Sequence, residues 1–369
     1  MALLLFFSAV SVVSLNPQSR LWSGQWSGLT WPAGRSMPGD PVSMTTGLYV
    51  DPRSQPAKWV RTNPGDPRQE AIKTGIAEMP ISRWFLGNDN DRAEASMYVR
   101  GAEAADKLPV LVAYNIPGRD CGQFSAGGAD GSVAYRKWVD GLAGAVGQRP
   151  AVVILEPDAL AQLDCRPDTQ RNEALALISY AVDQFANRAP NTWVYIDAGH
   201  SNWVDSATMA ERLRRAHVGN ARGFSLNVSN YQPTEANVAY GQEVVERMEP
   251  DGIHPTFVID TSRNGRPPAG SEWCNPAGQQ VGDRPRPGGA YGLDLQLWVK
   301  PPGEYDGACG VAPEGNAGDF QPSAALGLLT GSDGGQWLLG LRKSTGVVSR
   351  DQDPWQRDLG LSRADPTGD

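Results

Sequence analysis

The sequence lacks the clustered lysine and arginine side chains that nucleic acids and anionic membranes require of their protein partners. Its 33 Lys and Arg residues are outnumbered by 41 Asp and Glu residues, which gives a net charge of -8 and a pI near 5.1. Because an acidic chain repels polyanions, both classes of partner are unfavourable. A neutral or basic ligand is easier to accommodate.

Several motifs of catalysis and metal binding are also missing. The cysteines form no CxxC or Cys/His zinc pattern, and neither a GxxxxGK[ST] phosphate loop nor a GxSxG serine motif is present. Among three histidines, only His200 lies in a suggestive context. Clustered aspartates could bind Mg²⁺ or Ca²⁺ for phosphoryl transfer, but without a phosphate loop this alternative ranks lower. We expect no metal and no other cofactor.

Four cysteines, Cys121, Cys165, Cys274 and Cys309, allow three disulfide pairings. Pairing Cys121 with Cys165 and Cys274 with Cys309 would close one long loop each, which suits an oxidising compartment. The competing interpretation is four buried free thiols in a cytosolic protein.

The ends of the chain differ in composition from its middle. Residues 1–15 contain an apolar run that is too short to span a bilayer and resembles the centre of a secretion signal, although no Lys or Arg precedes it. From this segment we expect a secreted, extracellular protein. No later run approaches transmembrane length. Residues 16–47, rich in Gly, Ser, Pro and Trp, predict a lead-in or linker, and residues 331–369 predict a loosely packed tail.

Residues 48–330 alternate between short apolar runs and alanine-rich stretches with helical spacing. The strand candidates are 82–86, 109–114, 151–155, 192–196, 223–227, 256–259 and 295–299. The helix candidates are 57–60, 69–76, 91–106, 133–146, 171–186, 206–215, 235–248 and 320–329. Such alternation predicts parallel strands with right-handed crossovers. Seven strands without a second hydrophobic centre favour an α/β fold of one domain, a seven-stranded parallel (β/α) barrel similar to the TIM barrel.

The third strand candidate ends abruptly at an acid, a proline and a second acid. Residues 152–155 are branched and apolar, which predicts a strand buried on both faces, and Glu156, Pro157 and Asp158 follow. In parallel α/β folds, catalytic side chains gather at the carboxyl ends of strands. The alternative for these acids is a soluble loop or a helix cap.

Polar side chains recur at the ends of the other strand candidates. Any one of them could be a turn or capping residue, but several on successive strands indicate a shared bowl. Crowded carboxylates separate one another's pKa values, so that one remains an acid while another, beside Arg or Lys, stays ionised. Inverting glycoside hydrolysis needs such a pair, roughly 6.5 to 9.5 Å apart. The strand-end residues are Tyr114, Asp120, Asp158, Asp197, His200, Trp203, Asn227, Asn230, Asp260, Arg263, Lys300, Glu304 and Asp306.

At this point the motifs support a resemblance to a known family. The stretches 114–121 (YNIPGRDC), 155–158 (LEPD), 196–203 (IDAGHSNW), 227–231 (NVSNY), 260–265 (DTSRNG), 272–274 (EWC) and 298–307 (WVKPPGEYDG) resemble the glycoside hydrolase family 6 cellulases in matching order. The resemblance spans about residues 48–325. It implies a secreted enzyme with a distorted seven-stranded (β/α) barrel that hydrolyses β-1,4-glucan with inversion.

The resemblance also assigns roles to individual carboxylates. Asp158 corresponds to the general acid, and Asp120 to the aspartate that acts through a water chain on the attacking water. Tyr114 corresponds to the tyrosine beside the distorted sugar, and Asp197 to an acid that tunes the site. Asp306 matches the aspartate proposed as base, yet the family pattern sets two cations against it, which would depress its pKa and make it a poor proton acceptor.

The remaining site residues are implied to bind the sugar chain. Lys300 and Glu304 would bind hydroxyl groups. Three of the 12 tryptophans, Trp84, Trp203 and Trp273, would stack on sugar rings. The family has the same disulfide pairing that the loops favour. The further substrate-binding candidates are His200, Asn227, Asn230 and Arg263.

Two departures from the family pattern bear on the mode of attack. Ala126 stands where relatives often have a serine, a contact made through the backbone. The stretch 303–309 is short, whereas chain-end-cutting relatives carry a longer insertion there, so we expect an open cleft and an endoglucanase. The alternatives are an exo-acting cellobiohydrolase of the same family and a non-catalytic glucan-binding protein on the same barrel. The expected partner is β-1,4-glucan, bound by a monomer.

Overall fold

The computed structural model describes residues 40–289 and 292–332, and within them the strands form one 8-stranded sheet in the order β1-β2-β3-β4-β5-β6-β8-β7. All neighbouring strands are parallel except β7, which pairs antiparallel with β8. The α/β barrel prediction is therefore confirmed. The predicted signal segment, residues 16–39 of the predicted lead-in and residues 333–369 of the predicted tail lie outside the described residues. The strands are β1 (Arg83–Phe85), β2 (Val110–Ala113), β3 (Ala151–Leu155), β4 (Thr192–Asp197), β5 (Gly223–Leu226), β6 (Thr256–Asp260), β7 (Arg286–Pro287) and β8 (Leu293–Leu297).

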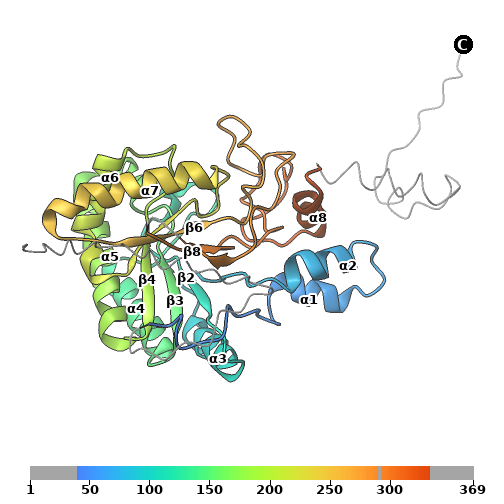
Figure 1. The fold of residues 1–369 in the computed structure, drawn as a ribbon, viewed down its shortest axis with the longest axis horizontal. Helices are drawn as coiled ribbons and strands as arrows, with labels where there is room; N and C mark the ends of the chain where they lie inside the picture. Colours follow the sequence, from blue (N-terminus) through green and yellow to red (C-terminus); the bar gives the residue numbers. More distant parts are fainter. Residues whose placement is uncertain (1–39, 290–291, 333–369) are drawn as a thin grey trace, which may run out of the picture.

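Helices connect the parallel strands and cover the outside of the sheet. In Figure 1, α4 to α7 lie together on one side, whereas α1, α2 and α8 lie together at the opposite end. Each predicted helix is present within a few residues of its predicted bounds. The helices are α1 (Gln55–Thr62), α2 (Gln69–Ile72) continued by a π-helical turn (Lys73–Ala77), α3 (Asp91–Ala104), α4 (Ser132–Val146), α5 (Asp168–Arg188), α6 (Ser206–Arg215), α7 (Thr234–Met248) and α8 (Pro322–Thr330), with short 3-10 turns at Asp120–Gly122, Ala161–Cys165, Val218–Asn220 and Glu249–Asp251.

The central strands are apolar throughout because both of their faces are buried. On β2, Val110 and Val112 point into the barrel, while Leu111 and Ala113 pack against the surrounding helices. Strand β3 shows the same division, and all five of its residues are buried. Side chains alternate between the two faces of a strand, so a continuous apolar run is what a barrel strand requires.

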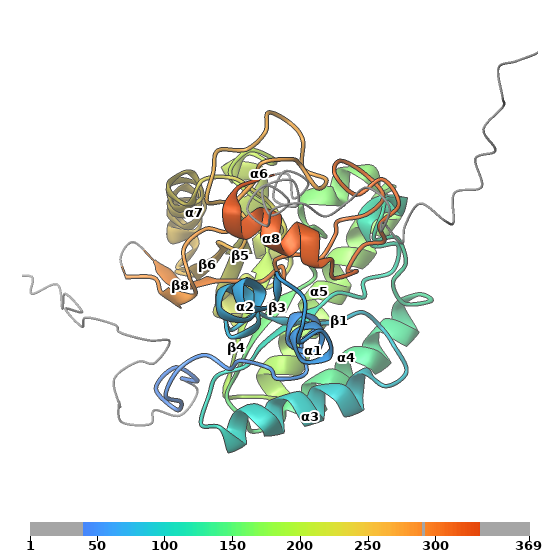
Figure 2. The same ribbon diagram turned by 90° about the vertical axis from the view of Figure 1, so that its right-hand side faces the viewer.

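The barrel is distorted where its first and last parallel strands meet. Between β1 and the chain after β8, the strand pairing is reduced to an isolated parallel bridge between Ile81 and Trp298, with a 3.0 Å hydrogen bond from Ser82 N to Trp298 O. A separate hydrophobic cluster that includes Val60, Ile76 and Trp298 covers this seam. Figure 2 shows α1, α2 and α8 gathered over it. Side-chain packing, rather than continuous strand pairing, closes the barrel here.

The sequence predictions differ from the structure in two details of the sheet. The last predicted strand, 295–299, begins two residues earlier as β8. The antiparallel strand β7 was not predicted, because two residues, one of them proline, give no alternating pattern. In the described part of the chain, no helix is long and apolar enough to cross a membrane.

Candidate active site

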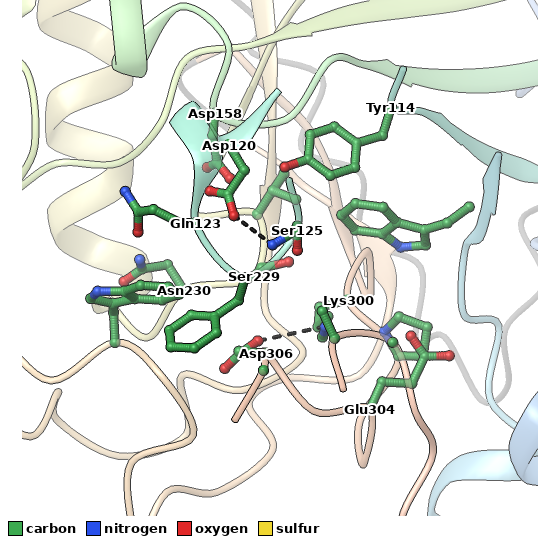
Figure 3. A pocket seen from close by; sticks show the side chains of 18 of the residues that line it. Tyr114, Asp120, Gln123, Ser125, Asp158, Ser229, Asn230, Lys300, Glu304 and Asp306 are labelled. Carbon is green, nitrogen blue, oxygen red and sulfur yellow. Dashed lines mark hydrogen bonds and ion pairs between the residues drawn. The ribbon is translucent and has the colours of Figure 1, made fainter. Parts of the chain in front are cut away.

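A cleft of 930 Å³ runs across the carboxyl ends of the strands, and most of the predicted site residues line it. Figure 3 shows Asp120 and Asp158 side by side, with Asp306 and Lys300 across the cleft from them. Four of the predicted strand-end residues lie outside the lining and support it: Asp197, Asn227, Asp260 and Arg263. Those that line the cleft are Trp84, Tyr114, Asp120, Asp158, His200, Trp203, Asn230, Trp273, Lys300, Glu304 and Asp306.

Asp158 lies in the wall of the cleft directly after β3. Burial raises the pKa of its carboxyl group well above the usual range, and the negative charges of Asp197, Asp120 and Asp306 raise it further, while Lys300 opposes them. This environment favours a protonated carboxyl group. An acid that keeps its proton near neutral pH can protonate a leaving group.

Asp197 holds the backbone of Asp158 from below. Its side chain is fully buried, and Asp158 N and Gly199 N donate to its Oδ1 at 2.9 and 3.0 Å. Ser225 Oγ donates to its Oδ2 at 2.9 Å. Burial raises the pKa of Asp197 to about 7, although these hydrogen bonds favour the ionised form.

Asp120 begins a short turn after β2 and faces Asp158. Ser125 N donates to its Oδ2 at 2.6 Å, and Gln162 Nε2 donates to its Oδ1 at 3.1 Å. Gln162 belongs to the turn that follows Asp158, so its amide group joins the two acid-bearing loops. The two hydrogen bonds hold the carboxylate of Asp120 in a fixed position beside Asp158.

Asp306 has the opposite environment to Asp158. Burial alone would raise its pKa, but two cations outweigh it and hold the pKa below the usual range. Arg263 Nη1 lies 2.9 and 2.8 Å from the two carboxylate oxygens, and Lys300 Nζ lies 3.5 Å from Oδ1. Asn275 N also donates to Oδ2 at 3.1 Å. Asp306 therefore remains ionised and is a weak proton acceptor.

Two further buried carboxylates brace the strand ends below the cleft. Glu156 Oε2 accepts hydrogen bonds from Asn115 N at 3.0 Å and Ile116 N at 2.9 Å, which ties the loop after β2 to the loop after β3. Asp260 accepts from the backbone N–H groups of Ser229 and Lys300, both at 3.0 Å. Burial raises the pKa of Glu156 to about 7.

Backbone strain is concentrated at these strand ends. Asp120, Glu156, Asp158, Asn227 and Ser229 have positive φ angles of 56°, 49°, 68°, 65° and 57°. L-residues seldom adopt this left-handed region, and such strain gathers at functional sites where the surrounding structure enforces it. The hydrogen bonds of Glu156, Asp197 and Asp260 provide that enforcement.

Aromatic rings line the cleft on both sides of the carboxylates. Trp84 and Tyr114 meet edge to face with ring centroids 5.5 Å apart, and Trp84 Nε1 donates to Val299 O at 2.9 Å. The ring of His200 lies 5.3 Å from that of Trp203. Burial lowers the pKa of His200 to about 4, so this ring is neutral at ordinary pH. Trp203 and Trp273 are about two-fifths exposed, which leaves an indole face open to a ligand.

Glu304 lies at the end of the cleft nearest α1. Burial raises its pKa to about 7, against the opposing effects of Lys300 and of a hydrogen bond from Gln55. Gln55 Nε2 donates to Glu304 Oε1 at 2.7 Å and to Gly318 O at 2.8 Å. Gln55 was not predicted from the sequence, since it lies far from any strand end and only the packing of α1 brings it here.

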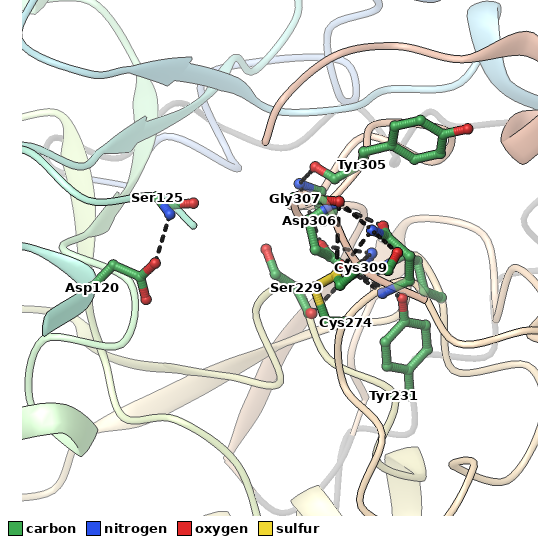
Figure 4. The surroundings of a disulfide bond; sticks show 12 residues. Asp120, Ser125, Ser229, Tyr231, Cys274, Tyr305, Asp306, Gly307 and Cys309 are labelled. Atoms are coloured by element: carbon green, nitrogen blue, oxygen red, sulfur yellow. Dashed lines mark hydrogen bonds and ion pairs between the residues drawn. A yellow bond between two sulfur atoms is a disulfide. The ribbon is translucent and has the colours of Figure 1, made fainter. Parts of the chain in front are cut away.

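Both predicted disulfides are present. Cys121 pairs with Cys165, with Cα atoms 6.4 Å apart, and Cys274 pairs with Cys309, with Cα atoms 5.9 Å apart. The first pair joins the loops of Asp120 and Asp158. The second joins the loop of Trp273 to that of Asp306, as Figure 4 shows for Cys274, Cys309 and Asp306.

Sequence reasoning missed several side chains that line the cleft, Phe124 and Gln162 among them. Phe124 lies three residues after Cys121 in a glycine-rich turn without periodicity, and Gln162 follows Asp158 by four residues. Neither position carries a pattern that distinguishes a functional residue from a loop residue.

Among the described residues, no three His, Cys, Asp or Glu side chains are arranged to hold a metal ion.

Comparison with known proteins finds similarity to one family and to endoglucanases. The family model of glycosyl hydrolases family 6 matches residues 44–338. Endoglucanase 1 of Streptomyces halstedii is 48% identical over 295 residues, which cover 79% of this chain and 91% of that protein. Endoglucanase A of Thermobispora bispora is 45% identical over 286 residues, and the match covers 76% of this chain but only 61% of that longer protein.

A similar fold is known from a solved structure. The endoglucanase Cel6 of Mycobacterium tuberculosis, solved with methyl-cellobiosyl-4-deoxy-4-thio-β-D-cellobioside, superposes with a TM-score of 0.73 at 39% identity. The superposition covers 79% of this chain and 99% of that one. The relative was therefore solved with a thio-linked cello-oligosaccharide.

Proposed function

Because this chain belongs to glycosyl hydrolase family 6, we propose that it is an inverting endo-β-1,4-glucanase in which Asp158 is the general acid. One observation carries the assignment. Two carboxylates line the same cleft, and their surroundings shift their pKa values in opposite directions, upward for Asp158 and downward for Asp306. Glycoside hydrolysis requires this division between a protonated and an ionised group.

In the proposed reaction, Asp158 donates its proton to the glycosidic oxygen as the bond from that oxygen to the anomeric carbon breaks. A water molecule attacks the anomeric carbon from the opposite face, which inverts its configuration. The water gives up one proton, and the enzyme regains the proton of Asp158 from solvent. Because Asp158 must be protonated, activity should fall as the pH rises past its raised pKa.

Asp120 is the group that receives the proton of the attacking water, through one or more further water molecules. Two donors, Ser125 N and Gln162 Nε2, hold its carboxylate in place beside Asp158. Asp306 is less suited to this step, since Arg263 and Lys300 already stabilise its negative charge. Its ionised carboxylate instead stabilises the positive charge that develops on the sugar ring.

The glucan chain lies along the cleft, where aromatic rings and polar groups alternate. Trp84, Trp203 and Trp273 stack on sugar faces, and Tyr114 borders the ring at the point of cleavage. The hydroxyl groups bind Lys300 and Glu304, with His200 and Asn230 contributing from the opposite side. Asn227, Arg263 and Asp197 act from beneath the lining, as their hydrogen bonds to Asp260, Asp306 and Asp158 indicate.

The short loop at 303–309 supports endo action, and we infer that the enzyme acts as a secreted monomer. The two disulfides favour an extracellular location. In an assay on carboxymethylcellulose, the viscosity should fall faster than reducing ends appear. Reducing ends that accumulate while the viscosity is unchanged would point to attack at chain ends instead.

The stereochemical test uses proton NMR during hydrolysis of cellohexaose. The α-anomer of the product should appear first and then equilibrate, and an initial β-anomer would contradict the mechanism. Asp158→Asn is the matched variant, because it keeps the size of the side chain and removes the acid. It should retain oligosaccharide binding and lose about 10² to 10⁴ of kcat. A variant that binds and cleaves as well as the parent would contradict the role of Asp158.

A further inference from the structure

An aromatic contact between Phe124 and Trp273 bridges the two walls of the cleft. One wall carries Asp120 and the turn that follows it, and the other carries Trp273 and Asp306; Figure 4 shows Ser125 and Asp120 on one side and Gly307 and Asp306 on the other. The ring of Phe124 reaches across this space: its centroid lies 6.1 Å from that of the Trp273 ring, and the two ring planes make an angle of 57°.

The opposite wall is shaped to receive Phe124. Gly307 directly follows Asp306, and a Cβ atom at this position would lie 2.4 Å from Phe124 Cγ. Only glycine is compatible with that approach. Gly307 also has a φ of 151°, a value that L-residues rarely adopt. The ring therefore has a defined seat beside the residue that flanks the cleaved bond.

The backbone on both sides of Phe124 is anchored by covalent and hydrogen bonds, whereas nearly half of the residue's surface is exposed. Cys121 is linked to Cys165, Ser125 N donates to Asp120 Oδ2 at 2.6 Å, and Arg119 Nε donates to Ser125 O at 2.8 Å. The ring pairs with that of Trp273, and the residues Phe124 and Trp273 remain 46% and 42% exposed. The bridge can therefore open by a side-chain rotation that leaves Asp120 in place.

We propose that Phe124 is a specificity-determining residue that closes the cleft over a bound glucan chain and must swing aside when a chain enters from the side. The inference rests on the proposed function. A short oligosaccharide can enter along the cleft beneath the closed ring and is held by it. A long or substituted polymer must enter laterally, so the same ring hinders its entry.

The test compares two substrates in the parent, Phe124→Ala and Phe124→Tyr. In Phe124→Ala, KM for cellohexaose should rise while the initial rate on carboxymethylcellulose is unchanged or higher. The ratio of kcat/KM on cellohexaose to the rate on carboxymethylcellulose should therefore fall, by roughly two- to tenfold for the loss of one aromatic pair. Phe124→Tyr keeps the ring and should keep the parental ratio.

The outcomes separate this inference from the function on which it rests. A parent enzyme that cleaves neither substrate would contradict the proposed function itself. A parent that cleaves both, with the same substrate ratio in Phe124→Ala, would overturn the role of Phe124 alone. Equal losses on both substrates leave the ratio unchanged and count against the proposal in the same way.

Discussion

The surroundings of Asp158, first its burial and then the neighbouring charges, keep its carboxyl group protonated. Burial is the largest cause of its raised pKa, and Asp197 is the neighbouring charge with the largest effect. The position of Asp197 beneath the loop, with its Oδ1 accepting from Asp158 N at 2.9 Å, makes it a positioning residue as well as a source of charge. These two contributions can be separated by a substitution that keeps the hydrogen bond.

Asp197→Asn should shift the alkaline limb of the pH profile of kcat to lower pH. An asparagine oxygen can still accept from Asp158 N, but the negative charge that raises the pKa of Asp158 is gone. The general acid then loses its proton at lower pH. The profile can be measured on cellohexaose, with Asp168→Asn as the control because the Asp168 side chain is 90% exposed. An alkaline limb that stays in place would show that Asp197 does not tune Asp158.

Glu156 gives a prediction about stability. Its folded pKa is about 7, above the value of about 4.3 for an unfolded glutamate, so the folded state binds more protons between these two values. Its contribution to the free energy of unfolding is fully present below about pH 4 and is lost as the pH rises through about 7. The slope for one such group is about 1.4 kcal/mol per pH unit.

Glu156→Gln should therefore flatten the dependence of the free energy of unfolding on pH in this window. Asp197 and Glu304, whose pKa values are also raised to about 7, keep part of the dependence in the variant. Urea unfolding at a series of pH values measures the slope. The same slope in the parent and the variant would mean that Glu156 ionises normally in the folded protein.

At the level of elements, the sequence was sufficient to predict the parallel strands and the helices, but not the antiparallel strand β7 or the packing of loops and helices around the cleft. Strand β3 was predictable because burial on both faces demands an unbroken apolar run, as in Val152 and Ile154. Gln55 and Phe124 were not predictable, since their positions follow from how α1 and the turn after β2 pack. The strand-end carboxylates could be predicted to lie near one another, because parallel strands bring their ends together whatever the details of packing. Their exact contacts could not be predicted.

The Cys121–Cys165 disulfide connects two of these elements, the turn after β2 and the turn after β3. Replacing both cysteines with serine should lower the free energy of unfolding by about 4 kcal/mol, the loop-entropy value for a 44-residue separation. It should also reduce kcat, because the Asp120 loop loses one anchor. Chemical denaturation and cellohexaose hydrolysis measure the two effects, and unchanged values of both would assign the disulfide no structural role.

For the whole molecule, the incomplete barrel explains where the cleft forms. The sheet does not continue from β8 back to β1 except for the isolated bridge at Ile81 and Trp298, and Ile81 and Ser82 beside this bridge line the cleft. Helices α1, α2 and α8 seal the seam, and α1 contributes Gln55 to the cleft. Residues separated by most of the chain, from Trp84 to Asp306, thus share one surface.

The central claim is that this shared surface holds Asp158 protonated while Asp306 stays ionised. A ¹³C NMR titration of the enzyme with labelled aspartate carboxyl carbons measures both states directly, with Asp158→Asn and Asp306→Asn to assign the two resonances. The resonance lost in Asp158→Asn should titrate above the pH of an ordinary aspartate, and the one lost in Asp306→Asn below it. Two resonances that titrate together, or in the reverse order, would contradict the account.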